Sequence, residues 1–463
     1  MHRLGSTVAA GCRMLLWSLM GMASLFAGCP EDAAGAEYRI QPSITLSEEF
    51  NDNIFLTPTD KQEDYITRVI PGIILSHKTA FWSWDLDAAY DYRSYLKRTR
   101  TEDSTHRLDL KNRTELIDNL LFFEGQDQYQ RVSIDVTKDF AQQSLFVNQA
   151  DQNLLTLNPY AVMRLGSASK MFLGYKYVNS QYHNAFVTSA TGTTGVPTEP
   201  VTTSTIDHIG YLETGSELSS NSSFTAGIRY TRDHHPLFPQ VALDQSRADD
   251  YYKTDVYAGP RYAYAPNSYV YCLIGESWLG FTVLPENKHL ENKHLSWDLG
   301  INHRYSTMTL AVWTKTDTVP DPFPTVRRTD QPVVSVRRVD QFVASLTRET
   351  TARTSLSGSA GWYEYRNAAT NHLENNAYRV SASIRHALSP KLTIAGDISN
   401  TRLHDYTLAA NTYLYEGGAR LEYRLLAELT SALGYLYTDS YSPDIYLQNY
   451  VNNRITLELT YRF

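Results

Sequence analysis

The last nine residues, Ile455-Thr456-Leu457-Glu458-Leu459-Thr460-Tyr461-Arg462-Phe463, alternate apolar and polar side chains without interruption. In an extended strand, successive side chains point to opposite faces. One face of this segment therefore carries Ile455, Leu457, Leu459, Tyr461 and Phe463, while the other carries only polar and charged groups. This pattern predicts a β-strand with one apolar and one polar face.

The same alternation recurs along the chain from Tyr38 onward, in segments of roughly 10 to 14 residues with no long helical pattern. In the segment from Tyr378 to Arg385, for example, Val380, Ala382 and Ile384 alternate with polar residues. The sequence therefore predicts an all-β protein. Periodicity alone fits two architectures: a soluble sandwich with an apolar core, or a membrane barrel whose apolar face meets lipid.

The lengths of the connections favour the barrel. Nine short turns are predicted, at His77–Thr79, Ile117–Asn119, Gly166–Ala168, Ser219–Asn221, Ala265–Asn267, Tyr305–Ser306, Arg348–Thr350, Ala387–Pro390 and Leu425–Ala427. Longer polar connections lie between them, notably Asp135–Gln152, Gln181–Ser204, His234–Asp249 and Thr318–Arg337. Strict alternation of short turns and long loops is typical of outer-membrane barrels, and a sandwich gives no reason for it.

Each short turn joins two strands and one strand remains at each end, which gives about 20 strands, within a range of roughly 16 to 22. The predicted fold is a transmembrane antiparallel up-and-down β-barrel over residues 37–463, with short periplasmic turns and longer extracellular loops. An even strand number places both termini on the periplasmic side of the cell outer membrane.

Residues 1–36 have the form of a secretory signal peptide. A positive segment containing Arg3 and Arg13 precedes a short apolar run, and Ala34-Gly35-Ala36 suits cleavage before Glu37. Cys29 also lies in a sequence similar to a lipoprotein processing site, so lipidation is an alternative outcome. After cleavage only Cys272 remains, which excludes an intramolecular disulfide and a thiolate metal site.

Composition supports an exported barrel and excludes other classes. The 463 residues include 33 Tyr against 16 Phe and 7 Trp, and Tyr favours surfaces that are apolar on one side and wet on the other. The single apolar run excludes a polytopic helical membrane protein. The net charge of −8 argues against a nucleic-acid binder, so no nucleic-acid partner is expected.

The polar strand faces would line the lumen. A 20-strand barrel is roughly 40 Å wide, too wide for side chains to fill. Because the strand pattern begins almost at Glu37, we expect no plug domain; Gln181–Ser204 is either a constriction loop or an outward projection. The predicted lumen-facing residues are Arg379, Arg385, Arg420, Glu422, Arg424, Glu458 and Arg462.

Two interpretations of this lumen stay open. The paired Arg and carboxylate side chains fit either a charged pore surface or rigid structural pairing of a wide polar wall. The aromatic residues fit either girdles at the membrane interface or an inward stacking track for sugars; the candidates are Tyr90, Tyr92, Tyr95, Tyr435 and Tyr437.

Two parts of the chain resemble known sequences: one an assembly signal, the other a protein family. The terminal Tyr461 and Phe463 resemble the carboxy-terminal signal that the barrel assembly machinery of bacterial outer membranes reads. The opening Thr45–Phe55, with Pro71-Gly72-Ile73 and Trp84–Asp87, is similar to the outer-membrane β-barrel porin family. More narrowly, it resembles the branch encoded with exosortase (PEP-CTERM) and exopolysaccharide gene clusters, which implies a barrel and suggests transport.

Three functions follow as hypotheses. The first is a porin-like channel for small solutes or saccharides, and the second is a conduit or scaffold in exopolysaccharide secretion, with polysaccharide or export machinery as partner. The third is a rim hydrolase, which the sequence disfavours because Gly-x-Ser-x-Gly and His-Glu-x-x-His motifs are absent. The expected protein is not an enzyme and needs no cofactor or metal; outer-membrane lipid surrounds it.

Overall fold

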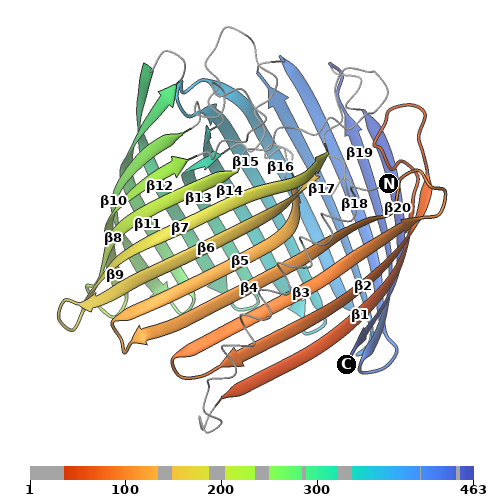
Figure 1. Cartoon of the computed structure of the whole chain (residues 1–463), viewed down its shortest axis with the longest axis horizontal. Helices are drawn as coiled ribbons and strands as arrows, with labels where there is room; N and C mark the ends of the chain where they lie inside the picture. The colour runs from red at the N-terminus through yellow and green to blue at the C-terminus, as the bar shows by residue number, and fades with distance from the viewer. Residues whose placement is uncertain are drawn as a thin grey trace, which may run out of the picture.

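The structure is a computed structural model that describes residues 36–133, 149–186, 204–234, 250–283, 288–320, 336–406, 408–444 and 449–463. These residues form one closed antiparallel barrel of 20 strands (Figure 1). The prediction of an all-β, up-and-down barrel of the transmembrane type is confirmed. Within the described ranges, no helix has the length and apolar character needed to cross a membrane. The predicted signal peptide and Cys29 lie outside the described residues.

The strands follow one another around the barrel in chain order. Their bounds are β1 Glu37–Asn51, β2 Asp64–Lys78, β3 Trp82–Tyr95, β4 Asp103–Ile117, β5 Leu121–Ser133, β6 Gln149–Arg164, β7 Ser169–Phe186, β8 Thr205–Glu217, β9 Ser222–His234, β10 Tyr251–Ala265, β11 Ser268–Val283, β12 Lys288–Tyr305, β13 Met308–Pro320, β14 Val336–Thr351, β15 Thr354–Asn367, β16 Leu373–Ala387, β17 Leu392–Asp405, β18 Ala410–Arg424, β19 Leu429–Tyr441 and β20 Tyr450–Arg462.

The first and last strands close the barrel. Antiparallel pairing between β1 and β20 runs from Ser43 opposite Arg462 to Asn51 opposite Arg454. The Phe463 amide also donates to the Pro42 carbonyl at 3.0 Å. Over this stretch the closure leaves no free sheet edge, which is the condition for a sheet to span a membrane.

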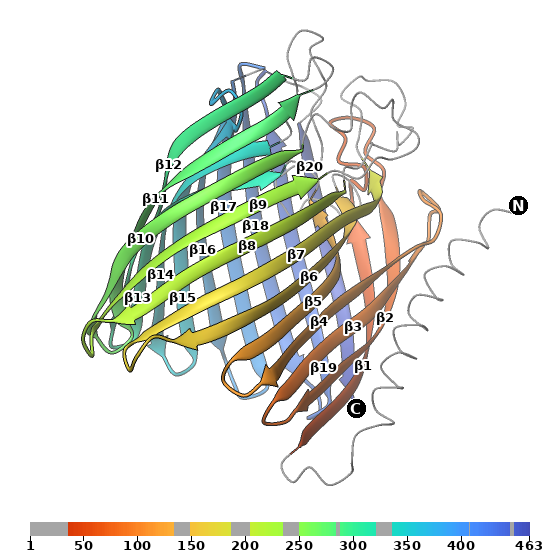
Figure 2. The same ribbon diagram turned by 60° about the vertical axis from the view of Figure 1, so that its left-hand side comes forward.

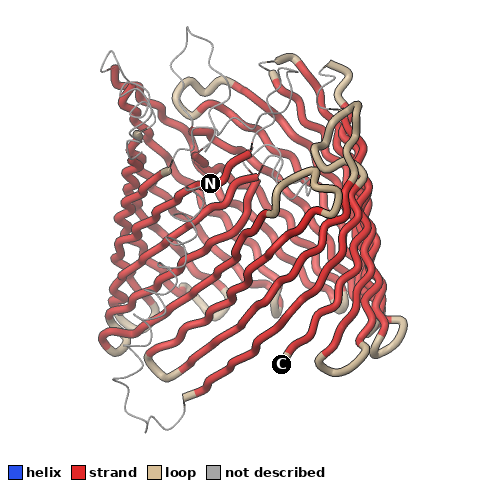
Figure 3. Tube along the Cα trace, turned by 45° about the vertical axis from the view of Figure 1, so that its right-hand side comes forward, coloured by secondary structure: helices blue, strands red, loops and turns tan. Residues whose placement is uncertain are grey.

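The two rims differ in the length of their connections, as predicted. One rim carries nine connections of two to four residues, and β1 begins and β20 ends at this rim (Figure 3). Connections at the other rim are four to 18 residues long. Asn119 and Asn267 supply the positive φ angles that such short turns require, at 53° and 59°. One predicted turn, Arg348–Thr350, is wrong: its polar residues belong to the end of β14, where a register shift at Glu349 and Thr351 extends the strand.

The two faces of the sheet differ in chemistry. On β20 the exposed Ile455, Leu457 and Leu459 share one face, while Glu458 and Thr460 share the other. Cross-strand register carries this division to the neighbouring strands, because Leu459 lies opposite Leu46 on β1 and Leu457 lies opposite Leu433 on β19. We call the face with the exposed aliphatic side chains the outer face and the opposite one the inner face.

At the long-loop rim, the sheet folds over itself between β4 and β5. Their pairing stops at Leu108 opposite Tyr129. Beyond that point Thr105, on the inner face, donates to Asp151 on the outer face at 3.1 Å, and Arg131 lies 3.5 Å from Asp103. The outer face of β5 and β6 therefore meets the inner face of β3 and β4, and this junction is called the first overlap.

A second overlap lies between β12 and β13, whose pairing stops at Asp298 opposite Lys315. Here Val336, on the outer face of β14, packs with Leu279 and Phe281 on the inner face of β11. The Asn292 side chain also donates to the Ala368 carbonyl at 2.6 Å. The upper ends of β14 and β15 thus lie inside the wall formed by β10–β12.

The connection 52–63 also folds inward. Its Ile54 and Leu56 pack with Ile66, Tyr95 and Tyr450, which lie on the inner faces of β2, β3 and β20. This loop and the two overlaps narrow the lumen at the long-loop rim. The inward path was not predicted from the sequence, although the apolar run Ile54-Phe55-Leu56 in a polar connection was a visible signal.

Candidate functional site

The inner face is the candidate functional site, and cross-strand register places the predicted lumen residues on it. Arg379 lies opposite Gly361 and Thr401, and Arg385 lies opposite Ser355. These two arginines flank a stretch of serines on β15–β17, including Ser359 and Ser381, whose hydroxyls are 2.7 Å apart. Register also puts Arg420, Glu422, Arg424, Glu458 and Arg462 on this face.

Some of the predicted residues pair with one another. Arg420 donates to Glu458 at 2.6 Å, across β18 and β20, and Arg385 lies 3.9 Å from Glu422. Both pairs remain accessible to the lumen. Arg462 is the last strand residue at the short-turn rim. The role of these residues in ion passage stays a prediction.

A second charged group, buried, lies toward the long-loop rim. Arg68 and Arg93 both donate to Asp91, at 2.7 and 2.6 Å, which joins β2 to β3. Arg454 donates to Glu49 at 3.1 Å and joins β20 to β1. Because these charges are withdrawn from water, each needs its partner, and the pairing fixes the register of the strands that close the barrel.

The aromatic candidates from the sequence divide between the two faces. Tyr90 and Tyr435 are exposed on the outer face, at 46% and 44%, where aromatic side chains form interfacial girdles in membrane barrels. Tyr92 and Tyr437 share that outer register. Tyr95 instead lies on the inner face and is buried beneath the connection 52–63.

A row of tyrosines on the inner face of β6–β11 was not predicted from the sequence. Tyr211 and Tyr257 alternate with Leu212 and Val256, which are exposed on the outer face. Four phenol hydroxyls are anchored by polar groups of other strands. They are Tyr160 to Glu124 at 2.9 Å, Tyr211 to Asn158 at 3.0 Å, Tyr257 to Glu213 at 2.6 Å and Tyr271 to Asp298 at 2.9 Å.

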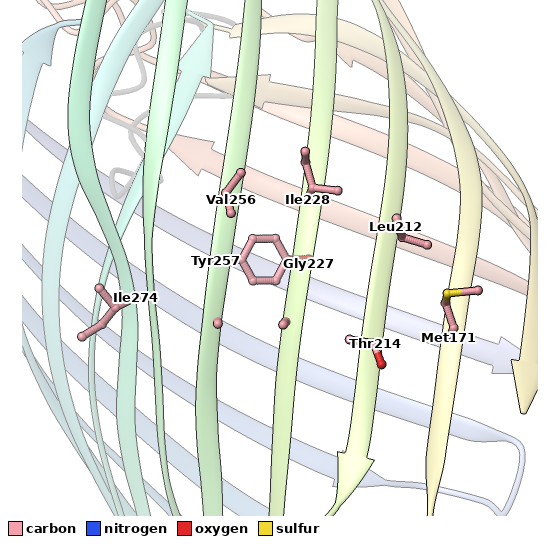
Figure 4. Close-up of a pocket in the computed structure, with 10 residues that line it drawn as sticks. Met171, Leu212, Thr214, Gly227, Ile228, Val256, Tyr257 and Ile274 are labelled. Atoms are coloured by element: carbon pink, nitrogen blue, oxygen red, sulfur yellow. The ribbon is translucent and has the colours of Figure 1, made fainter. Parts of the chain in front are cut away.

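Three of these rings lie over glycines of a neighbouring strand. A Cβ added at Gly174, Gly227 or Gly300 would collide with the ring of Tyr211, Tyr257 or Tyr271 respectively. Figure 4 shows the Tyr257 ring lying against β9 at Gly227. The abundance of Tyr was visible in the sequence, but the Tyr–Gly contacts depend on strand register.

A shallow apolar depression of about 460 Å³ lies on the other side of this wall (Figure 4). Outer-face residues form most of it, including Leu212, Ile228, Val256 and Ile274. Small side chains at Ala226 and Ala258 leave the hollow. The depression lies mainly on the outer face, but Gly227 and Tyr257 of the tyrosine row also line it.

The inner face carries no arrangement typical of metal chemistry in the part of the chain that the structure describes: no three His, Cys, Asp or Glu side chains group together there. Several of its acids are instead tied to Arg, Lys, Tyr or Gln. Asp109, for example, accepts from Lys111 at 2.8 Å and from Gln126 at 3.1 Å. The wall therefore offers hydrogen-bonding groups held in fixed positions.

No family model matches the chain, and no curated protein matches it. Among solved structures it is similar to the FrpB iron transporter from Neisseria meningitidis (F3-3 variant), with a TM-score of 0.47 and 10% identity over 91% of this chain and 81% of that one. It is also similar to the ferric citrate transporter FecA, with a TM-score of 0.49 and 10% identity over 92% and 78% of the two chains. A third similar structure is the copper transporter OprC, with a TM-score of 0.49 and 8% identity over 94% and 82%. These similarities concern the barrel architecture, and a function has to be inferred from the wall of this barrel.

Proposed function

We propose that this protein is an outer-membrane channel of the porin type, which passes small solutes or saccharides. The observation that carries the proposal is the chemistry of the two faces of a closed 20-strand barrel. The outer face exposes aliphatic side chains that suit lipid, and the inner face presents polar and charged groups that suit water. A barrel of this strand number is roughly 40 Å across, which leaves room for an aqueous path.

The orientation follows from the two rims. In outer-membrane barrels the short turns face the periplasm and the long loops face outward. The rim where β1 begins and β20 ends would then be periplasmic. The terminal strand, with Tyr461 and Phe463, would be read there by the barrel assembly machinery.

A second candidate is an outer-membrane part of exopolysaccharide secretion, as conduit or scaffold. It is favoured by the resemblance of residues 40–95 to barrels encoded with exosortase and exopolysaccharide genes. The inward-folded connection 52–63, with the apolar contacts of Ile54 and Leu56, lies within this stretch and narrows one end of the lumen. A narrowed lumen suits a conduit that opens on contact with a partner. Neither candidate requires catalysis, and we propose no enzymatic role.

The test is single-channel recording of the refolded chain from Glu37 to Phe463 in a planar bilayer. An open channel is expected to give stable steps of nanosiemens order. A barrel that inserts fully, as shown by protease protection, yet conducts no ions would overturn the open-channel proposal and favour the secretion role. Arg420→Glu and Arg385→Glu, which reverse lumen charge, should shift the reversal potential in a salt gradient toward cation selectivity.

A further inference from the structure

We propose that the tyrosine row on the inner face of β6–β11 is a binding wall for neutral saccharides. This inference rests on the proposed function, because it names the class of solute that the lumen would bind. It arises from ring placement, from anchored hydroxyls and from the polar groups between the rings.

At two places on this wall a glycine lies between aromatic residues of the two neighbouring strands. Gly174 on β7 lies directly between Tyr160 on β6 and Tyr211 on β8. Gly300 on β12 likewise lies between Tyr271 on β11 and Trp313 on β13. The backbones of every second strand are about 9–10 Å apart, given the strand spacing of a sheet.

Each glycine lets the neighbouring ring lie flat on the wall. The rings of Tyr211, Tyr257 and Tyr271 occupy the space that a Cβ would need. One face of each ring therefore covers backbone, and the rings are only partly buried. The Arg229 guanidinium lies 5.9 Å from the centroid of the Tyr257 ring and adds a cationic group beside that ring. A ring held in this way is a platform for stacking that loses little conformational entropy when a ligand binds.

The anchored hydroxyls fix the rings and supply polar partners beside them. Glu213 accepts from Tyr257 at 2.6 Å, and Asp298 accepts from Tyr271 at 2.9 Å. Each carboxylate has further lone pairs that can accept from a ligand hydroxyl. A guanidinium group also lies over a ring of this wall: Arg261 is 4.0 Å from the centroid of Tyr269.

This combination matches a saccharide better than other solutes. A sugar ring presents C–H groups on its faces, which suit the negative face of an aromatic ring, and hydroxyls on its rim, which suit carboxylates and guanidiniums. A purely apolar solute would leave these polar groups unsatisfied. The carboxylates along the row, Glu124, Glu213 and Asp298, are balanced by the guanidinium groups of Arg113, Arg229 and Arg261. The row therefore has no excess positive charge to attract an acidic saccharide.

Strand β10, which carries Tyr257, also offers a matched control that tests whether Tyr–Gly contacts are purely structural. Tyr252 on β10 lies over Gly280 of β11 in the same kind of contact, but on the outer face. If Tyr–Gly contacts only stiffen the sheet, substitutions of Tyr252 and Tyr257 should behave alike. If the inner row binds sugar, only Tyr257 should matter for binding.

The experiment is calorimetric titration of the refolded chain, in detergent micelles, with maltohexaose and cellohexaose, and with an oligogalacturonate of the same length as the acidic comparison. We expect saturable binding of a neutral oligosaccharide, weakened roughly tenfold in Tyr257→Leu and in Tyr211→Leu. Tyr257→Phe should keep most of the affinity because the ring remains. Tyr252→Leu should leave affinity unchanged.

An equal loss of saccharide affinity in Tyr252→Leu and Tyr257→Leu would overturn the proposal. So would the absence of saturable binding by both neutral oligosaccharides, or tighter binding of the oligogalacturonate. Far-ultraviolet circular dichroism and heat-modifiable gel mobility check that each variant is folded. If Tyr257→Leu fails to fold, Tyr211→Leu supplies the same comparison. Saccharide binding without ion conductance would contradict the proposed channel and support the proposed binding wall. Ion conductance without saccharide binding would support the channel and contradict the binding wall.

Discussion

At the scale of single residues, the charges of the inner wall differ in how far they are withdrawn from water. The Glu49 side chain is 0% exposed and its partner Arg454 is 14% exposed, whereas Arg420 and Glu458 are 47% and 25% exposed. A buried charge that loses its partner is costly, while an exposed pair contributes little because water screens it. The sequence showed which residues were charged but not which were buried.

This difference predicts unequal effects of two arginine substitutions. Arg454→Ala should lower the free energy of unfolding by about 3–5 kcal/mol, since it leaves Glu49 buried and unpaired beside the closing strands. Arg420→Ala should cost less than about 1 kcal/mol. Urea unfolding of the barrel in lipid vesicles, followed by Trp fluorescence, measures both. Equal midpoints for the two variants would contradict a closing role for the buried pair.

At the scale of the element, β20 combines several requirements in 13 residues. Its outer face carries the exposed aliphatic side chains, its inner face carries Arg454 and Glu458, and its last residues pair with Ser43 and Ile44 of β1. Because the side-chain period is two, a slip of one residue would exchange the two faces. The same substitution should therefore change stability by very different amounts at adjacent positions on this strand.

We expect Leu457→Arg to destabilise the barrel in vesicles by up to about 2–4 kcal/mol, because it places a charge against lipid. Thr456→Arg points to the inner face, opposite Glu49 of β1, and should change stability by less than about 1 kcal/mol. Unfolding midpoints in vesicles give the comparison. A larger loss for Thr456→Arg than for Leu457→Arg would reverse the assignment of faces.

Deletion of Phe463 separates recognition from stability on the same strand. The Phe463 side chain is 69% exposed and contacts Tyr461, with 4.7 Å between ring centroids. Its removal should therefore change refolding in vitro very little. If the barrel assembly machinery reads this end, the deletion should reduce the folded protein in the outer membrane of expressing cells several-fold. Unchanged membrane yield, measured by quantitative blotting, would argue against such recognition.

At the scale of the whole molecule, the barrel is not a simple cylinder, because its sheet overlaps itself twice at the long-loop rim. The tilt of the strands, seen in Figure 2, brings β5–β12 across the front of the barrel as one continuous wall. The second overlap holds β14 against that wall through Phe281 and Val336, both 0% exposed. This apolar cluster lies inside an otherwise polar lumen and packs the end of β14 against β11.

Phe281→Ala should loosen the second overlap. We expect a loss of about 3–5 kcal/mol in unfolding free energy, from lost burial and the cavity left behind. Mean single-channel conductance should rise, since β14 would no longer be held inside the wall. Phe224 lies on the outer face of β9, so Phe224→Ala should lower the unfolding free energy less and should leave the conductance unchanged. Reduced stability with unchanged conductance would show that the overlap lies away from the ion path.

The sequence by itself determined the strands, their alternating faces, the two kinds of rim and the common rim at which β1 begins and β20 ends. These follow from local rules: a period of two, turn residues, and an even number of strands. Arg420 and Glu458 could be assigned to the polar face for the same reason.

Only the tertiary structure decided the overlaps, the inward path of the connection 52–63 and the row of tyrosines on glycines. Each of these depends on register and on contacts between segments far apart in the chain, such as Asn53 with the Val451 carbonyl at 3.1 Å. A period-two pattern tells which face a side chain takes, but not which residue lies opposite it. For that reason Tyr257 could be counted in the sequence, and its place over Gly227 appeared only when β9 and β10 were paired.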